Sequence, residues 1–545
     1  MNTQLWLHEL ASDEDEDFLA NGITCGFQIV PASTNFANVD MDNYKSATNP
    51  NAKPLVEQTI RNEIAEGNYS ISANKPTIVS ALGAIPKPDS SEIRLIHDCS
   101  RPHGQAVNDY VTTDSFKYQT LDDALKRLRP NYYMAKIDLR HAYRSVPIHP
   151  SNYQATGCKW KFTGEDEYTY FYDRRLPFGA KSSPGIFHRL TQAVRRMMER
   201  RGFEDVIVYL DDFLVIGKSL HECQLAYEML KTLLTDLGFQ LSTHKLIPPT
   251  QRLVFLGVQL DTHLGEMTLP RPKLLEFQSL VNHFLTKRRA NLNQLQKLAG
   301  KLNWACRVVF GGRTFLRRVL DMMNSLKSSK AKCRLSADFH DDLQWWVKFL
   351  QQFNGKRLFL DSLPTVDVQT DACPLAAGAF YRGDWFYHHF SLDSPQWDPL
   401  HINHKETLAI ILAAQRWHKA WVNQHVIIHS DNQAAVNIIN KGSTANRIIM
   451  KNLRELFWLS AVNNFRITAR YIRGSQNITA DAVSRLHNPK HCLTLYKELR
   501  RWRPAGHIER TPLGNHMSAH CAQFLRYRYS EPSSGLVPPG GNISV

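Results

Sequence analysis

Apolar residues along the chain change their spacing several times, and these changes divide the chain into successive segments. Residues 56–66 have the helical spacing of apolar positions. Between about residues 77 and 261, short runs rich in Val and Ile alternate with helical stretches, which is typical of an α/β or α+β unit. Residues 271–330 are helical in period and basic, and a second alternation of strands and helices runs from about residue 366 to residue 486. We therefore predict two mixed α/β units joined by a basic helical segment.

The segments outside this alternation differ from it in composition. An acidic run at residues 13–17 lies in a polar N-terminal stretch, which we expect to be weakly structured and solvated rather than a metal site. The stretch after residue 330 is linker-like, and its two tryptophans, Trp345 and Trp346, are predicted core residues. After residue 487 the chain is basic and then rich in Pro and Gly, so we predict that it ends in a disordered tail.

The charge of the chain favours a polyanionic partner. At 545 residues, of which 43% are hydrophobic and 21% charged, the chain is too long for one core and has an ordinary globular composition. Lys and Arg number 66 against 51 Asp and Glu, a net charge of +15. This excess suits nucleic acid, although a basic protein without such a partner would have the same charge.

The spacing of cysteines and the length of apolar runs predict the cellular compartment of the protein. The nine cysteines form no CxxC pair, which argues against a zinc knuckle or a disulfide scaffold and favours a reducing compartment. No apolar run is long enough to span a bilayer, and the N-terminus has no apolar signal core. We therefore expect a protein of the cytoplasm, the nucleus or both that is neither secreted nor in a membrane.

Two adjacent aspartates, Asp211 and Asp212, lie at the centre of the apolar run 206–216. Apolar residues on both sides predict a β-hairpin whose turn holds the two carboxylates together. A lone Asp-Asp turn is more often structural, but Asp138 ends another short apolar run and offers a partner. Phosphoryl transfer by two metal ions needs carboxylates from separate strands, converging on ions roughly 3.5–4 Å apart. Asp138 and Asp211 are the expected bridging ligands, with Asp212 close by.

Five blocks around these acids, and a sixth upstream of them, resemble, in order and spacing, the motifs of reverse transcriptases. The Tyr-Leu-Asp-Asp sequence at 209–212 is similar to their Tyr-x-Asp-Asp box, residues 136–143 to their first palm motif and residues 176–187 to their second. Residues 237–245 resemble the motif whose lysine, here Lys245, lies near the incoming nucleotide. The resemblance implies that Phe255, Leu256 and Gly257 form the primer grip.

The same resemblance implies a nucleotide site. Lys87 and Arg94 fall where the fingers of the family hold the triphosphate, which suits the chemistry of both side chains. Tyr143 takes the place of an aromatic ring under the sugar of the incoming nucleotide. A ring there would clash with a 2′-hydroxyl, so the resemblance implies dNTP selection, while a core role is the alternative. Phe178 stands where retroviral enzymes have Gln and retrotransposon enzymes often have Phe.

A further match lies in the basic helical segment. Gln296, Gly300 and Trp304 recur every four residues and therefore share a helix face. They match the thumb helix that follows the minor groove of the primer–template, where Gly would permit close approach. Core packing is the alternative for Trp304.

Four further carboxylates each lie at the end of a predicted strand or near the start of a predicted helix: Asp371, Glu406, Asp431 and Asp481. Singly, each would more often be a capping or solvated acid. Together they resemble the Asp-Glu-Asp-Asp tetrad of ribonuclease H, a similarity that spans residues 363–487 and implies two Mg²⁺ ions and hydrolysis of phosphodiesters. The loop 473–477 lacks the histidine of cellular ribonuclease H, which leaves the rate of cleavage open.

Over residues 50–487 the chain resembles the reverse transcriptase/ribonuclease H of DIRS-like retrotransposons, on residues 94–109, 180–184 and the end of the ribonuclease H similarity. The implied fold is multidomain, α+β and α/β: a right-hand polymerase with fingers, palm and thumb, followed by a ribonuclease H-like α/β domain. The implied segments are an acidic, flexible N-terminal extension (1–54), fingers and palm (55–262), thumb (263–330), connection (331–362), the ribonuclease H-like domain (363–487) and a C-terminal tail (488–545).

The implied function is DNA synthesis from dNTPs on RNA and DNA templates, with hydrolysis of the RNA strand of RNA–DNA hybrids. Each site would use two Mg²⁺ ions, with Mn²⁺ as a substitute, and the partners would be an RNA template, a DNA primer and their hybrid. A capsid-like protein and a recombinase would lie on separate chains. A gypsy-like or pararetroviral polymerase and a domesticated, inactive nucleic-acid-binding protein stay open as alternatives. A phosphate-binding loop ending at residues 216–219 is excluded, because its first glycine would be Asp212.

Overall fold

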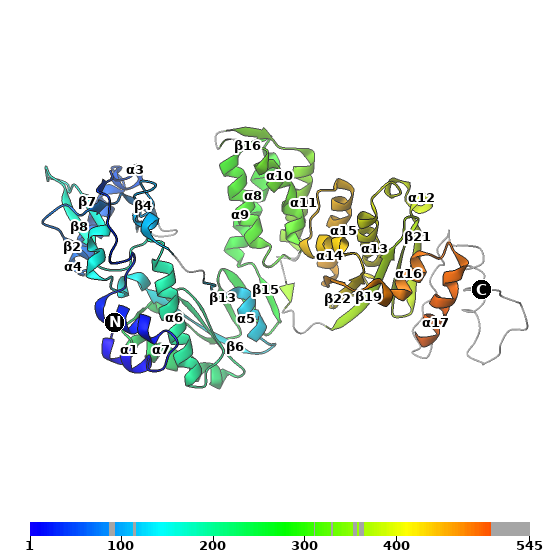
Figure 1. The fold of residues 1–545 in the computed structure, drawn as a ribbon, viewed down its shortest axis with the longest axis horizontal. Helices are drawn as coiled ribbons and strands as arrows, with labels where there is room; N and C mark the ends of the chain where they lie inside the picture. The colour runs from blue at the N-terminus through cyan, green and yellow to red at the C-terminus, as the bar shows by residue number, and fades with distance from the viewer. Residues whose placement is uncertain are drawn as a thin grey trace, which may run out of the picture. The chain divides into compact units, whose positions relative to one another are not determined.

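The computed structural model describes residues 1–86, 93–112, 116–309, 311–326, 328, 331–352, 357–358 and 364–502 (Figure 1). The chain divides into two compact units. The first comprises Met1–Leu256 and Leu260–Gly265, and the second comprises Gly257–Gln259 and the chain from Glu266 onward. Each unit is described by itself.

The N-terminal segment is folded onto the first unit. It contains the elements α1 (Thr3–Glu9), α2 (Glu16–Cys25), β1 (Val39–Asp40) and α3 (Lys45–Thr48). Trp6 is fully buried, and the Asp13 carboxylate pairs with Arg196 (2.6 Å) and Arg200 (3.2 Å). The expectation of a flexible, solvated extension is therefore wrong for this segment, because Trp6 is buried and Asp13 and Asp15 pair with arginines of a distant helix.

The next part of the first unit is a five-stranded sheet with the order β1-β3-β7-β8-β2. Its further elements are α4 (Lys53–Ala65), β2 (Tyr69–Ile71), β3 (Ile78–Val79), β7 (Gly157–Trp160) and β8 (Thr169–Asp173). β4 (Leu82–Pro86) and β5 (Ile93–His97) form a separate antiparallel pair. A buried ion pair between Arg144 and Asp173 (2.6 Å) ties β8 to the segment that follows β6.

The central sheet of the first unit has the order β11-β6-β10-β9, with β12 also paired to β6. Its strands are β6 (Tyr133–Arg140), β9 (Val206–Tyr209), β10 (Asp212–Gly217), β11 (Gln240–Leu241) and β12 (Ile247–Thr250). The helices of this part are α5 (Leu121–Arg127), α6 (Ser183–Arg200) and α7 (Leu220–Asp236). α6 contacts β9, and α7 contacts β6 and β10. The apolar residues on both sides of Asp211 and Asp212 therefore form the predicted hairpin and are covered by helices.

The second unit begins with helices, as the sequence predicts for residues 271–330. They are α8 (Arg271–Thr286), α9 (Leu292–Ala305) and α10 (Arg317–Asn324), with the strand pairs β15 (Glu266–Thr268)–β18 (Arg357–Leu358) and β16 (Arg289–Asn291)–β17 (Lys332–Arg334). The stretch expected to be linker-like instead contains the long helix α11 (Ala337–Gln352). Its buried Asp342 pairs with Arg454 at 2.6 Å, and Trp345 packs on Trp458. These partners lie more than a hundred residues away, where local periodicity cannot reveal them.

The rest of the second unit is built on a mixed sheet, the C-terminal sheet, with the order β21-β20-β19-β22-β23. Its elements are β19 (Thr365–Ala372), β20 (Ala376–Tyr381), β21 (Asp384–His389), β22 (His425–Ser430) and β23 (Arg466–Tyr471), with α12 (Phe390–Asp393), α13 (Ile402–Trp417), α14 (Gln433–Lys441), α15 (Arg447–Asn463), α16 (Ile478–Ser484) and α17 (Cys492–Trp502). β19, β22 and β23 are parallel, whereas β20 and β21 are antiparallel to their neighbours. Every residue of β20 is buried, so helices cover both of its faces.

Two helices at the end of this unit pack on the C-terminal sheet and on each other. α16 contacts β19 and β20, and a Cβ on Gly378 would lie 2.4 Å from the backbone N of Ser484, so glycine is needed for this close approach. α17 belongs to the stretch expected to be a tail, but its Leu495 and Leu499 are buried in the same core as Trp385. The residues after 502 lie outside the described chain. No helix in the described ranges is both long and apolar enough to cross a membrane.

Candidate active sites

The first candidate site is the turn of the β9–β10 hairpin. Tyr209 pairs with Asp212, which leaves Leu210 and Asp211 as a two-residue turn. Leu210 has a φ of 53°, a left-handed conformation that costs a non-glycine residue about 1–3 kcal/mol. Asp212 also pairs with Asp138 across β10 and β6. The structure thus brings together the three aspartates that the sequence singles out.

Two lysines neutralise part of this acidic site. Lys245 Nζ lies 2.9 Å from Asp138 Oδ1, and Lys136 Nζ lies 2.7 Å from Asp212 Oδ1. Lys136 stands two residues before Asp138 on β6 and so projects from the same face of the strand. Asp211 forms no ion pair with any residue that the structure describes. The three carboxylates therefore exceed their local cations, which suits a divalent ion.

Burial makes the two hairpin carboxylates hard to ionise. It raises the pKa of Asp211, and repulsion from Asp212 and Asp138 raises it further. Burial also raises the pKa of Asp212, although the hydrogen bond and charge of Lys136 oppose the shift. A bound cation would relieve this repulsion, so the donor set fits a metal ion.

Two aromatic rings named from the sequence lie against each other beside these acids. Tyr143 follows β6, and its ring stacks on Phe178 with centroids 4.9 Å apart and an interplanar angle of 27°. Phe187 supports the same ring at 5.4 Å. Burial raises the pKa of the Tyr143 hydroxyl, and the charges of Tyr118 and Asp211 add to the shift. Tyr143 therefore has both a packing role and a place near the carboxylates.

The structure describes most of the residues predicted to bind the triphosphate or to form the primer grip. Arg94 lies on β5, whereas Lys87 lies outside the described residues. Phe255 is fully buried at the end of β13 (Arg252–Phe255). Leu256 and Gly257 have φ values of 46° and 79°, so they form a tight two-residue turn before β14 (Val258–Asp261).

On the face of α9 that the sequence singles out, two residues are exposed to solvent and the third packs against other side chains. Gln296 and Gly300 are exposed, and a Cβ added to Gly300 would meet nothing within 4 Å. Trp304 is half-buried, packs on Phe277 at 5.7 Å and would lie 2.8 Å from a Cβ on Gly257. Packing thus accounts for Trp304 but not for Gly300, which as a helix-interior glycine costs about 1 kcal/mol relative to Ala.

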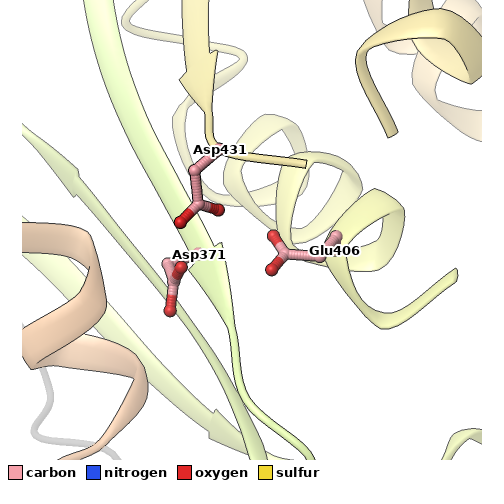
Figure 2. A group of neighbouring side chains, drawn as sticks. All are labelled: Asp371, Glu406 and Asp431. Carbon is pink, nitrogen blue, oxygen red and sulfur yellow. The ribbon is translucent and has the colours of Figure 1, made fainter. Parts of the chain in front are cut away.

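The second candidate site lies at the edge of the C-terminal sheet where β19 and β22 end. Carboxylate oxygens of Asp371, Glu406 and Asp431 all lie within 4.8 Å of one another. Figure 2 shows the two aspartates side by side and Glu406 reaching toward them from α13. Because β19 and β22 are parallel, the acids at their carboxyl ends meet at one edge.

Burial raises the pKa of the acids in this cluster. Burial and the charges of Asp371 and Asp431 raise the pKa of Glu406 to about 9. Burial also raises the pKa of Asp371 to about 7, against a hydrogen bond of 2.5 Å from Ser484 Oγ. Glu406 Oε2 is buried and has no hydrogen-bond partner among the residues that the structure describes. An orphaned oxygen among three converging carboxylates fits a metal ion.

The fourth acid of the predicted tetrad stands beside this cluster. Asp481 lies on α16, and Arg485 Nε donates to its Oδ1 at 2.7 Å. Its charge contributes to the raised pKa of both Asp371 and Asp431, so it acts on the cluster. The loop without histidine passes close by, since a Cβ on Gly474 would lie 3.0 Å from Asp431 Oδ2.

Known proteins resemble the chain in both sequence and fold. Residues 85–260 match the family model described as reverse transcriptase (RNA-dependent DNA polymerase). This segment is a reverse transcriptase domain. The genome polyprotein of Petunia vein clearing virus (isolate Shepherd) is 22% identical over 70% of this chain and 17% of its own length. The Retrovirus-related Pol polyprotein from transposon 297 of Drosophila melanogaster is 22% identical over 76% of this chain and 36% of its own. The chain thus spans well under half the length of these two curated relatives.

Solved structures extend the likeness beyond the reverse transcriptase domain. The foamy viral protease-reverse transcriptase in complex with dsDNA has a TM-score of 0.53 and 18% identity, over 87% of this chain and 98% of that one. The same protein in complex with an RNA/DNA hybrid has a TM-score of 0.52 over 87% of this chain and 63% of that one. This likeness confirms the predicted mixed α/β fold with a polymerase domain.

Sequence reasoning missed the groups that surround the acids. In the reverse transcriptase domain it overlooked Lys136, although the Lys-x-Asp spacing on a strand places both side chains on one face. In the second site it included Ser484 and Arg485 in the ribonuclease H resemblance but gave neither a contact with the acids. The spacing of Arg485, four residues after Asp481 on a helix, was a usable signal for an ion pair. Nothing in the sequence pattern indicates the Ser484–Asp371 hydrogen bond.

Proposed function

We propose that the chain is an RNA-directed DNA polymerase that also hydrolyses the RNA strand of RNA–DNA hybrids, for the replication of a retrotransposon. One observation carries the polymerase activity. Inside the reverse transcriptase domain, Asp211 and Asp212 stand at the strained turn of the β9–β10 hairpin, and Asp138 faces Asp212 from the adjacent strand β6. Strain of this kind is characteristic of functional sites.

Asp138 and Asp211 would hold the metal ions of the polymerase site, with Asp212 beside them. Two Mg²⁺ ions, or Mn²⁺ in their place, would activate the primer 3′-hydroxyl and stabilise the leaving pyrophosphate. Lys245 is half-exposed in its pair with Asp138, so it can turn to an incoming triphosphate. Arg94 and Lys87 would bind the same triphosphate. The ring of Tyr143 would exclude a 2′-hydroxyl and so select dNTPs.

Nucleic-acid substrates are supported by charge and by the surface of α9. The net charge of +15 suits an RNA template, a DNA primer and their hybrid. The solved foamy viral relatives are complexes with dsDNA and with an RNA/DNA hybrid. Gly300 has no packing reason inside the chain, which supports close approach of a nucleic-acid backbone along Gln296 and Gly300. We also propose that Phe255, Leu256 and Gly257 form the primer grip, which would hold the DNA primer.

The second site would hydrolyse the RNA strand. Asp371, Glu406 and Asp431, with Asp481 beside them, would hold two Mg²⁺ ions. Because the pKa of Glu406 is about 9, the cluster needs these ions to stay ionised at neutral pH. The loop 473–477 lacks histidine, so we expect a lower rate of RNA cleavage and an unchanged metal site.

The proposed domain division follows these sites. Fingers and palm occupy 55–262, the thumb 263–330, the connection 331–362 and the ribonuclease H-like domain 363–487, with 488–545 after it. The change of compact unit between residues 256 and 266 supports the first of these boundaries.

We assign the element to the DIRS-like group on the run 94–109. A gypsy-like or pararetroviral polymerase would have the same two activities, and the relatives in Petunia vein clearing virus and transposon 297 fit it as well. A recombinase reading frame beside the gene would support the DIRS-like assignment, and an integrase frame would overturn it. If the element is DIRS-like, we also expect its capsid-like protein and its recombinase to be encoded as separate chains.

Primer extension tests the polymerase function directly. The wild-type protein is expected to add dNTPs to a DNA primer on an RNA template with Mg²⁺, Asp211→Asn to lose this activity, and the exposed control Asp236→Asn to keep it. If the wild type binds the primed template but adds no nucleotide, the chain is instead an inactive nucleic-acid-binding protein.

A further inference from the structure

The side chain of Asn108 joins two loops of the first unit. Its Nδ2 donates to Ser100 Oγ at 2.8 Å and to the Gly179 carbonyl at 3.0 Å. Its Oδ1 accepts from the backbone N–H of Lys181 at 2.7 Å. Both donors of the amide are therefore used, and one side chain connects the loop after β5 to the loop that follows Phe178.

The loop held by Asn108 also packs directly on β5. His97 N donates to the Phe178 carbonyl at 3.2 Å. A Cβ on Gly179 would lie 1.9 Å from the His97 carbonyl oxygen, and Gly179 has a φ of 143°, so only glycine fits there. The backbone at residues 178–179 is thus fixed on one side by β5 and on the other by Asn108.

Phe178 links this fixed backbone to Tyr143, because its ring stacks on the tyrosine ring. The two rings stack at 4.9 Å, and Phe187 also contacts the tyrosine ring, with centroids 5.4 Å apart. Phe178 is more than a third exposed, so few other contacts hold its ring. If the loop shifts away from β5, the Tyr143 ring therefore loses the partner that sets its angle.

We propose that Asn108 is a positioning residue for sugar selection: it holds the Gly179 loop on β5, and Phe178 thereby keeps Tyr143 at the angle that excludes a 2′-hydroxyl. This proposal rests on the proposed polymerase function and names the residue that fixes the geometry of its nucleotide site. Phe178 has no hydrogen-bonding atom in its side chain, so its part in the selection is ring position alone.

Single-nucleotide insertion of a dNTP and of the matching rNTP, on one primed template, tests the proposal. Asn108→Ala is expected to lower the ratio of dNTP to rNTP efficiency about tenfold, while dNTP insertion itself changes less. Asn108→Asp keeps the acceptor for Lys181 but cannot donate to Gly179, so it should lose selectivity as well. The exposed Asn35→Ala, in the same unit, is the matched control and should keep the wild-type ratio.

A double-mutant cycle separates a positioning role from a structural one. Tyr143→Val should lose selectivity, and adding Asn108→Ala to it should lower the ratio no further, because Asn108 acts through Tyr143. An equal loss of dNTP and rNTP insertion in Asn108→Ala, or an additive loss in the double variant, would overturn the proposal. If the Asn108 variants do not fold, Phe178→Leu tests the same proposal, because it removes the ring that stacks on Tyr143. An unchanged ratio of dNTP to rNTP efficiency in Phe178→Leu would also overturn the proposal. A wild type that inserts no dNTP would instead refute the polymerase function itself.

Discussion

At the scale of single residues, the two sites neutralise their buried acids in different ways. In the reverse transcriptase domain, Lys136 and Lys245 lie within 3 Å of two of the three aspartates. In the second site the pKa of Glu406 is about 9, and the charge of Arg485 opposes that shift only in part. A bound cation would therefore stabilise the ionised form of the second site more than that of the first.

Removal of the lysine beside the hairpin should destabilise the first unit. Lys136→Met leaves Asp212 largely buried without its cation, beside two other carboxylates. We expect the free energy of unfolding to fall by about 1–3 kcal/mol, and Mg²⁺ to restore part of the loss. Lys126→Met removes an exposed ion pair with Asp123 and should change the stability by less than about 0.5 kcal/mol. Urea unfolding measures both, and equal effects would contradict the role given to Lys136.

The stability of the metal-free protein should depend on pH through Glu406. Its folded-state pKa of about 9 lies above the ordinary 4.5, so the unfolded chain releases this proton first. The free energy of unfolding should therefore fall as pH rises from about 4.5 to about 9, and Mg²⁺ should flatten this dependence. Melting temperatures in a chelator and in Mg²⁺ test it. Glu406→Gln should weaken the dependence, whereas the exposed Glu455→Gln should not; the same slope in both variants would refute it.

At the scale of elements, the sequence predicted what local pattern determines. The apolar residues around Asp211 and Asp212 require a hairpin, and the period of residues 271–330 requires helices, and both are present. The N-terminal helices were missed because Asp13 finds its partner, Arg196, more than 180 residues away. Helix α11 was missed for the same reason, since its Asp342 is satisfied by Arg454. The acids of both sites could be named from motif order, but the groups that set their charge depend on tertiary contacts.

The contact between the acidic run and α6 should be essential for docking of the N-terminal helices. Burial raises the pKa of Asp13, but hydrogen bonds and charge from Arg196, and a hydrogen bond from Arg200, bring the pKa below its usual value. Asp13→Asn should therefore cost about 1–3 kcal/mol at neutral pH. Because the folded-state pKa is depressed, this contribution should begin to fall below about pH 4 and be lost once the pH is below the folded-state pKa. Asp17→Asn, on the exposed side, is the control. Unfolding at pH 7 and pH 3 measures both, and an equal cost at the two values would contradict the ion pair.

At the scale of the whole molecule, each compact unit has its own carboxylate site. Asp138, Asp211 and Asp212 all belong to the first unit. The four acids of the second site, Asp371, Glu406, Asp431 and Asp481, belong to the second unit. No side chain is shared between the two sites, so each should be removable without the other.

The measurement that tests the proposed two-site enzyme most directly is one reaction with separately labelled strands. A labelled DNA primer on a differently labelled RNA template, with dNTPs and Mg²⁺, reports synthesis and cleavage together. Asp211→Asn should abolish primer extension and leave RNA cleavage intact, and Asp431→Asn should do the reverse. Loss of both activities in either single variant, with hybrid binding retained, would contradict two independent sites.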